Sequence, residues 1–229
     1  MPCLPLDGRR QALQPSIRGR RPACHGDPSQ RGAAAGQVSA GLLGLVPHGR
    51  IIRNMGTHRT RALPPPTQML RTTGHDWAVR LLRAAVAEGR VAHAYLVTGP
   101  DGVGKRHLAR YLSAMLQCAS DAPPCGVCGA CLRIAQDVHP DVNVVAPDEG
   151  HIKIDQVRAV QHELSLSPYE GRLRIAVFLD FDTATPEAAN ALLKTLEEPP
   201  ARDVLILTAT DPSLLLPTVV SRCQNLPLR

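Results

Sequence analysis

The chain has 229 residues, 44% of them hydrophobic, which is enough for one ordinary core and an appendage. Its formal charge of +6 is concentrated in residues 1–68, where ten arginines stand against two aspartates, while residues 69–229 carry a small acidic excess. The charge of residues 69–229 therefore does not support nucleic-acid binding by that part of the chain. No apolar run is long enough for a transmembrane helix or a secretory signal. We expect a cytoplasmic protein without a membrane partner.

Residues 1–68 scatter proline, glycine and arginine among few β-branched residues. Such a segment buries too little apolar surface to offset the entropy lost on ordering, which predicts a disordered basic extension. An arginine-rich leader could also be an organellar transit peptide, but proline and glycine interrupt any amphipathic period here. From residue 69 the composition changes, and we expect residues 69–229 to form one folded domain.

Helical and strand patterns alternate through residues 69–229. Apolar residues at helical spacing over 77–86 precede a short buried strand, Ala94–Thr98. The sequence then predicts, in chain order, a helix after Lys105, a cysteine-rich insertion, a strand over 142–146, a helix over about 155–166, a strand over 174–180, a helix over about 186–198, a strand over 204–209, and a last helix and strand between 213 and 228. Helices between parallel strands supply the crossovers that such strands need. The predicted class is α/β, with a parallel sheet covered by helices on both faces.

A glycine-rich loop, GPDGVGK, directly follows the first strand. Backbone N–H groups of such a loop curl around a phosphate, and the N-terminus of the next helix adds its dipole. The candidate nucleotide-binding residues of this loop are Gly99, Gly102, Val103, Gly104 and Lys105. A plain glycine-rich turn is the alternative, which the position after an apolar strand disfavours. Arg106 stands where the full pattern has a hydroxyl for magnesium, so we leave ATP or ADP open as a ligand and expect no Mg²⁺.

Two further candidates lie at the ends of later strands. The apolar segment RIAVFLD ends in Asp180, the place at which ATPases keep an acid that orients hydrated magnesium. Hydrolysing ATPases usually follow this acid with a glutamate that polarises water, and here Phe181 follows. Buried strands that end in aspartate are common, so only the pairing with the glycine loop makes Asp180 a candidate. Thr210, after strand 204–209, could sense a phosphate from the carboxyl edge of the sheet.

Four cysteines lie close together in the insertion, spaced C-x6-C-x2-C-x2-C. Four thiolates can close a tetrahedral site around Zn²⁺ and leave no open position, which favours structural over catalytic zinc. Buried thiols, a redox CxxC and an iron–sulfur cluster are the alternatives, and the doubled CxxC with a fourth partner disfavours the first two. The predicted ligands are Cys118, Cys125, Cys128 and Cys131.

Several segments together resemble bacterial DNA polymerase III clamp-loader subunits, the gamma/tau and delta-prime family of AAA+ proteins. The segments are AHAYLVTGPDGVGK, the cysteine insertion, HIKIDQVRAVQHELSLSPYEGRLRIAVFLD, AANALLKTLEEPP and SRCQNLPL, from about Gly74 to the end. The resemblance implies an AAA+ nucleotide-binding domain over residues 69–229, zinc on the four cysteines (a module at about 118–131), and an arginine finger at Arg222 that reaches ATP in a neighbouring subunit. Implied partners are the gamma/tau and delta subunits, the sliding clamp and, through the complex, primed DNA.

Two departures from the gamma-type ATPase favour a delta-prime-like role. Arg106 and Phe181 replace the hydroxyl and the glutamate, whereas Arg222 is retained. We therefore expect a subunit of the DNA polymerase III complex that helps load the clamp onto primed DNA and completes a neighbour's ATPase site without its own hydrolysis. The first alternative is a gamma/tau-type ATPase in which Asp182 or another acid replaces the glutamate.

The family continues into a helical lid domain and a collar domain, whereas the sequence ends at Arg229. We expect neither domain within this sequence, which is then a fragment, a truncated gene product or a partial gene model, and assembly through a collar stays open. A second alternative follows from this, namely a zinc-bearing interaction module that works outside the clamp loader.

Overall fold

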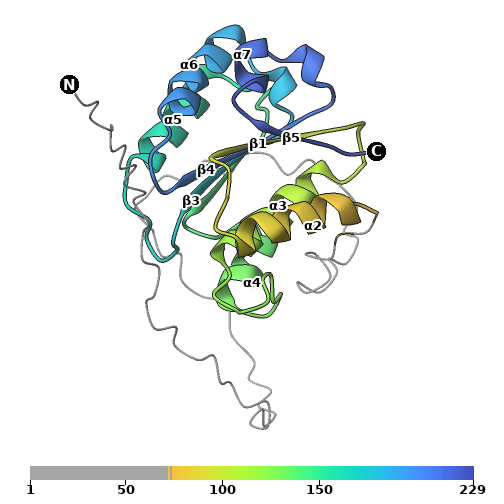
Figure 1. The fold of residues 1–229 in the computed structure, drawn as a ribbon. Coiled ribbons are helices and arrows are strands. Elements are labelled where there is room, and N and C mark those ends of the chain that lie inside the picture. The colour runs from red at the N-terminus through yellow and green to blue at the C-terminus, as the bar shows by residue number, and fades with distance from the viewer. Residues whose placement is uncertain (1–71, 73) are drawn as a thin grey trace, which may run out of the picture. The chain divides into compact units, whose positions relative to one another are not determined.

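The computed structural model describes residue 72 and residues 74–229, which form a parallel five-stranded sheet between two layers of helices (Figure 1). The strands are β1 (Ala94–Thr98), β2 (Val142–Val145), β3 (Arg174–Phe178), β4 (Asp203–Ala209) and β5 (Gln224–Pro227). The helices are α2 (Asp76–Ala87), α3 (Lys105–Gln117), α4 (Gly129–Ala135), α5 (Ile154–Leu164), α6 (Pro186–Glu197) and α7 (Pro217–Val220), with 3-10 turns η1 (Phe181–Thr183) and η2 (Pro212–Leu214). The predicted α/β class is confirmed, while the predicted extension over residues 1–68 lies outside the described residues.

The strand order is β2-β3-β4-β1-β5, and every neighbouring pair is parallel. Strands β1, β3 and β4 are buried along their whole length, because helices cover both faces of the sheet. Alternate residues of one strand serve the two layers: Tyr95 and Val97 pack with α2, α3 and α4, whereas Ala94 and Leu96 pack with α5, α6 and α7. Figure 1 shows the same division of the helices between the two faces.

Local signals explain the bounds of α6 and the end of β3. Thr185 caps α6 by accepting the N–H of Ala188, Pro186 opens the helix, and the pair Pro199–Pro200 follows its end. The predicted strand over 174–180 is two residues too long, since β3 ends at Phe178. Asp180 has a left-handed backbone with φ 50°, which turns the chain out of the strand and into η1.

The carboxyl ends of the strands meet at one edge of the sheet, where ligands of open α/β folds bind. The glycine loop follows β1 there, η1 follows β3, and Thr210 follows β4. In the part of the chain that the structure describes, no helix has the length and apolar composition needed to cross a bilayer.

Candidate nucleotide loop and metal centre

The glycine loop has the backbone that its sequence predicts. Gly99 has φ 149° and passes so close to the residue after β5 that a Cβ atom there would lie 2.6 Å from the carbonyl oxygen of Leu228. Gly104 caps the N-terminus of α3 with φ 105°, a backbone conformation that residues with a Cβ atom rarely adopt. Both glycines are therefore required by the backbone path between β1 and α3.

Lys105, the lysine of the loop, is buried, with 6% of its surface exposed. Its ammonium donates to the carbonyl oxygens of Gly99 at 2.8 Å and of Pro100 at 3.4 Å, and to the Asp101 carboxylate at 3.0 Å. These three contacts use the three protons of the ammonium. A phosphate bound by Lys105 would have to displace the Asp101 carboxylate, the only acceptor of the three that carries a charge.

His75 supports the loop from outside, and the sequence patterns did not single it out. It is buried at the N-terminus of α2, and its Nε2–H donates to the carbonyl oxygen of Val103 at 2.7 Å. The carbonyl can only accept, so this bond requires the proton on Nε2. The histidine therefore ties α2 to the loop at a position 28 residues away in the sequence.

Arg106, the residue in place of the magnesium-binding hydroxyl, points away from the loop. Its guanidinium donates to the Asp137 carboxylate at 2.9 Å, and Arg110 donates to both oxygens of the same carboxylate. Burial opposes ionisation of Asp137, but the two guanidinium groups outweigh it and hold the pKa of this carboxyl below its usual value. Arg106 thus joins α3 to the end of α4 rather than offering a ligand to a cation.

Asp180 and Phe181, in the turn after β3, differ in burial. Asp180 is exposed, and its backbone N–H donates to the Thr208 hydroxyl at 2.8 Å, while its carboxylate has no hydrogen bond or ion pair within the described residues. Phe181 is 1% exposed and packs edge-to-face on Phe178, with ring centroids 5.6 Å apart. The side chain at position 181 therefore belongs to the core and contributes nothing to the carboxyl edge.

Asp182, and not Asp180, is the acid that contacts Thr210. One oxygen of the Asp182 carboxylate accepts both the backbone N–H of Thr210, at 3.0 Å, and its hydroxyl. The carbonyl oxygen of Thr210 accepts the N–H of Gly99 at 3.2 Å. A short chain of hydrogen bonds thus runs from η1 through the end of β4 to the first residue of the glycine loop, and the spacing of the sequence alone could not select Asp182 for it.

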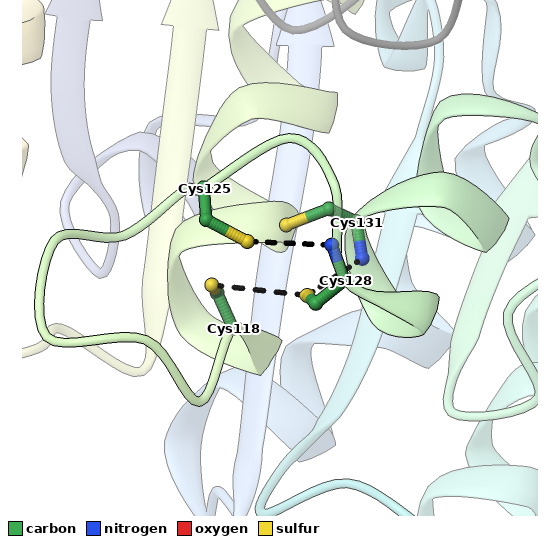
Figure 2. A group of neighbouring side chains, drawn as sticks. All are labelled: Cys118, Cys125, Cys128 and Cys131. Carbon is green, nitrogen blue, oxygen red and sulfur yellow. Dashed lines mark hydrogen bonds between the residues drawn. The ribbon is translucent and has the colours of Figure 1, made fainter. Parts of the chain in front are cut away.

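The four predicted metal ligands converge. Their Sγ atoms all lie within 4.8 Å of one another, and Figure 2 shows the four thiols turned toward a common centre. Four thiolates about 2.3 Å from one Zn²⁺ would lie about 3.8 Å apart in a tetrahedron. The Sγ atoms of Cys118 and Cys128 are 3.9 Å apart, which fits this geometry, and all five described cysteines are free of disulfides. The cluster could therefore hold one metal ion.

Two secondary-structure elements hold the cysteines in place. Cys118 caps the C-terminus of α3, and Cys128 caps the N-terminus of α4, which also contains Cys131. Backbone N–H groups of Cys128 and Cys131 point at the sulfurs of Cys125 and Cys128, at 3.4 and 3.5 Å. Such N–H contacts stabilise thiolates, which are the form that binds a metal.

The thiols differ in their acidity. Burial raises the pKa of Cys118 and of Cys131. Burial also acts on Cys125, but hydrogen bonds from the backbone of Val127 and Cys128 outweigh it and lower its pKa to about 7. A metal must displace protons from the buried pair, so its binding is coupled to pH. Cys223 lies outside this cluster, and burial raises its pKa to about 12.

Arg222 lies just after α7, and this helix packs on the same face of the sheet as α5 and α6 (Figure 1). Its guanidinium donates to the carbonyl oxygen of Thr218 at 2.9 Å and pairs with the Glu197 carboxylate at 2.9 Å. No hydrogen bond or ion pair in the described residues joins it to the glycine loop. The contacts of Arg222 are thus made to α6 and α7, and its side chain is one third exposed.

Residues 74–229 match the family described as "DNA polymerase III, delta subunit". The chain belongs to this family. It is 38% identical over 152 residues to the DNA polymerase III subunit delta' of Bacillus subtilis, an alignment that covers 66% of the chain and 46% of that protein. It is 39% identical over 153 residues to the delta' subunit of Pseudomonas aeruginosa, covering 65% of the chain and 47% of that protein. The predicted resemblance is confirmed.

The gamma/tau subunits are also similar. The chain is 35% identical over 167 residues to DNA polymerase III subunit gamma/tau of Mycobacterium bovis, covering 72% of the chain and 29% of that protein. A crystal structure of a gamma subunit-related DNA polymerase III protein from Thermotoga maritima superposes with a TM-score of 0.52 at 27% identity, covering 66% of this chain and 45% of that one. The AAA+ type of fold is thereby confirmed, and the chain spans about half the length of the delta' relatives it matches.

Proposed function

We propose that this chain is a delta-prime-like subunit of the DNA polymerase III clamp loader. In this role the chain helps place the sliding clamp on primed DNA and contributes Arg222 to the ATPase site of a neighbouring subunit. The observation that carries the proposal is the position of Phe181 in the core. A residue buried against Phe178 cannot polarise water at the carboxyl edge. The change to Arg106, whose guanidinium is engaged by Asp137, supports the same conclusion.

In this proposal residues 69–229 form an AAA+ domain whose loop can retain a nucleotide without hydrolysing it. The loop backbone at Gly99, Gly102, Val103 and Gly104, with Lys105, would hold phosphates, and Thr210 and Asp180 line the same edge of the sheet. The phosphates of ADP or ATP would pair with the charge of Lys105. Arg106 has no hydroxyl and would not help to hold Mg²⁺. Zn²⁺ on Cys118, Cys125, Cys128 and Cys131 would be structural, since four thiolates complete its coordination.

Arg222 would act on the neighbour by stabilising charge on the transferring phosphoryl group. Arginine fingers in GTPase systems contribute roughly 10³–10⁵ in rate. The partial exposure of Arg222, and the fact that its contacts in the described residues are to α6 and α7 and not to the loop, support a role in trans.

The decisive experiment is the ATPase rate of a reconstituted complex of this chain with the gamma/tau and delta subunits of the same organism, in the presence of clamp and primed DNA. We expect no turnover by this chain alone and a loss of at least about a hundredfold at one site after Arg222→Ala. ATP turnover by the isolated chain, or undiminished clamp loading with Arg222→Ala, would refute the proposal.

One observation favours a second candidate, a gamma/tau-type ATPase. The carboxylate of Asp182 contacts Thr210, which contacts Gly99 of the loop, so an acid does stand next to the candidate nucleotide site. Turnover by the isolated chain that is lost on Asp182→Asn would establish this candidate instead.

A further inference from the structure

Glu197, the last residue of α6, lies against Arg222 across the contact between α6 and α7. Its Oε1 is 2.9 Å from Nη2 of the guanidinium, and the side chains are 51% and 34% exposed. Nη1 of the same guanidinium donates to the carbonyl oxygen of Thr218 at 2.9 Å and lies 3.4 Å from the Ser221 hydroxyl. Three acceptors from two elements therefore fix one arginine that is in part open to solvent.

The place of Glu197 is electrostatically unfavourable without Arg222. A carboxylate at the C-terminal end of a helix faces the negative end of the helix dipole, where cations are preferred. Arg222 is the sole ion-pair partner of Glu197 among the described residues. The pairing thus compensates an unfavourable charge position and at the same time restricts the side chain of Arg222.

The contacts leave part of the guanidinium free. Arginine has five N–H donors, and the acceptors around Arg222 take the Nη1 protons and one Nη2 proton. Nε–H and the second Nη2–H have no acceptor in the described part of the chain. Phosphate oxygens of another molecule can accept charge-assisted hydrogen bonds from guanidinium donors that are free in this way.

We propose that Glu197 is a positioning residue for Arg222, which holds the guanidinium with two donors free for the phosphates of a nucleotide on a neighbouring subunit. The inference rests on the proposed role of Arg222 in trans. Glu197 touches no nucleotide itself. It acts by limiting the conformations of Arg222, so that fewer have to be lost when the transition state forms.

The test measures ATP turnover of the reconstituted complex with Glu197→Gln and Glu197→Lys, with Glu198→Gln and Glu198→Lys as controls. Glu198 is the neighbouring exposed glutamate, which has no ion pair in the described residues, so the control matches the charge change. We expect Glu197→Gln to lower kcat about two- to fivefold, as for a half-exposed ion pair, without a change in KM. Glu197→Lys is expected to lower kcat further, because it repels the guanidinium.

Two readouts separate positioning from a general structural effect. The difference between wild type and Glu197→Gln should shrink between 50 and 200 mM salt, because salt screens the pair. Glu197→Gln should also have no further effect in an Arg222→Ala background, as a double-mutant cycle requires of a residue that acts through another. Equal rates for the Glu197 and Glu198 variants, a rise in kcat, or a full effect in the Arg222→Ala background would each overturn the inference.

The outcome for Arg222→Ala distinguishes the inference from the proposed function. A large loss with Arg222→Ala and none with either Glu197 variant refutes the positioning role alone. No loss with Arg222→Ala refutes the role of Arg222 in trans, and the positioning role falls with it.

Discussion

Thr210 donates its backbone N–H and its hydroxyl to the same carboxylate oxygen of Asp182, while the other oxygen of that carboxylate is buried without a partner. The pair connects the turn after β3 to the end of β4, and the carbonyl oxygen of Thr210 accepts a hydrogen bond from the backbone N–H of Gly99. The Asp182 carboxylate is thus linked, through Thr210 at the end of β4, to the first residue of the candidate nucleotide loop. We expect the stability of this region to depend on the charge of Asp182.

Loss of the Asp182 charge should destabilise the domain. Hydrogen bonds to charged groups contribute about 1.5–3 kcal/mol, so we expect Asp182→Asn to lower the free energy of unfolding by about 1–3 kcal/mol, measured by urea denaturation. Asp180→Asn is the matched control, because the Asp180 carboxylate is exposed and has no partner in the described residues, and its effect should stay within about 0.5 kcal/mol. Similar losses for both variants would contradict the assignment of Asp182.

Removal of the Asp101 charge should strengthen nucleotide binding. The carboxylate holds Lys105 at 3.0 Å and must leave before a phosphate can take its place. Because the Asp101 side chain is 86% exposed, the gain for Asp101→Asn is modest, a Kd for ADP lowered by up to about fivefold in isothermal titration calorimetry. Lys105→Ala should abolish binding as a control. Weaker binding by Asp101→Asn than by wild type would show that this carboxylate assists the ligand.

Zinc removal should unfold the module around Cys118–Cys131. We expect one zinc per chain by elemental analysis, lost in Cys128→Ser, together with a melting temperature lower by more than about 5 °C. Cys223→Ser keeps all four clustered thiols and should retain the metal. Binding should weaken as the pH falls, because burial raises the pKa of Cys118 and Cys131 and protons then compete better with the metal. A full complement of zinc in Cys128→Ser would contradict the site.

Asp203 should make the domain less stable as the pH rises. It is 8% exposed and its Oδ2 has no partner, so burial raises its pKa from 3.8 to about 6, although Arg174 opposes this. A carboxyl with a raised pKa in the folded state contributes stability below pH 4 that is lost as the pH rises through 6. The free energy of unfolding of Asp203→Asn minus that of wild type should therefore rise by about 1–3 kcal/mol between pH 4 and 6, because wild type loses stability, and then level off. A difference independent of pH would contradict this.

The sequence by itself determined the features that depend on neighbouring residues. Strand β1 was predicted with its observed bounds, because four apolar residues and a threonine directly before a glycine loop leave little choice. The convergence of the four cysteines also followed from spacing, since all four lie within fourteen residues and the chain between them is too short to carry them apart. The backbone of Gly99 and Gly104 agrees with the loop pattern for the same local reason.

Tertiary structure decided which side chains meet across the fold. Trp77 and Leu81 fit a helical apolar pattern, yet they are 39% and 38% exposed, and Ala78 and Leu82 form the buried face of α2. The orientation of that face depends on how α2 packs on α3, which no local spacing encodes.

The pairs that define the candidate site have the same origin. The partners in the Asp182–Thr210 pair are 28 residues apart and those in the Arg106–Asp137 pair 31 residues apart. Glu197 and Arg222 come from α6 and from the turn after α7. Contacts of this kind form only when strands take their order in the sheet and bring distant turns to a common edge or face. The residue types predicted an α/β fold with a glycine loop and a cysteine cluster, and the packing of the sheet and its helices selected the partner of each charged group.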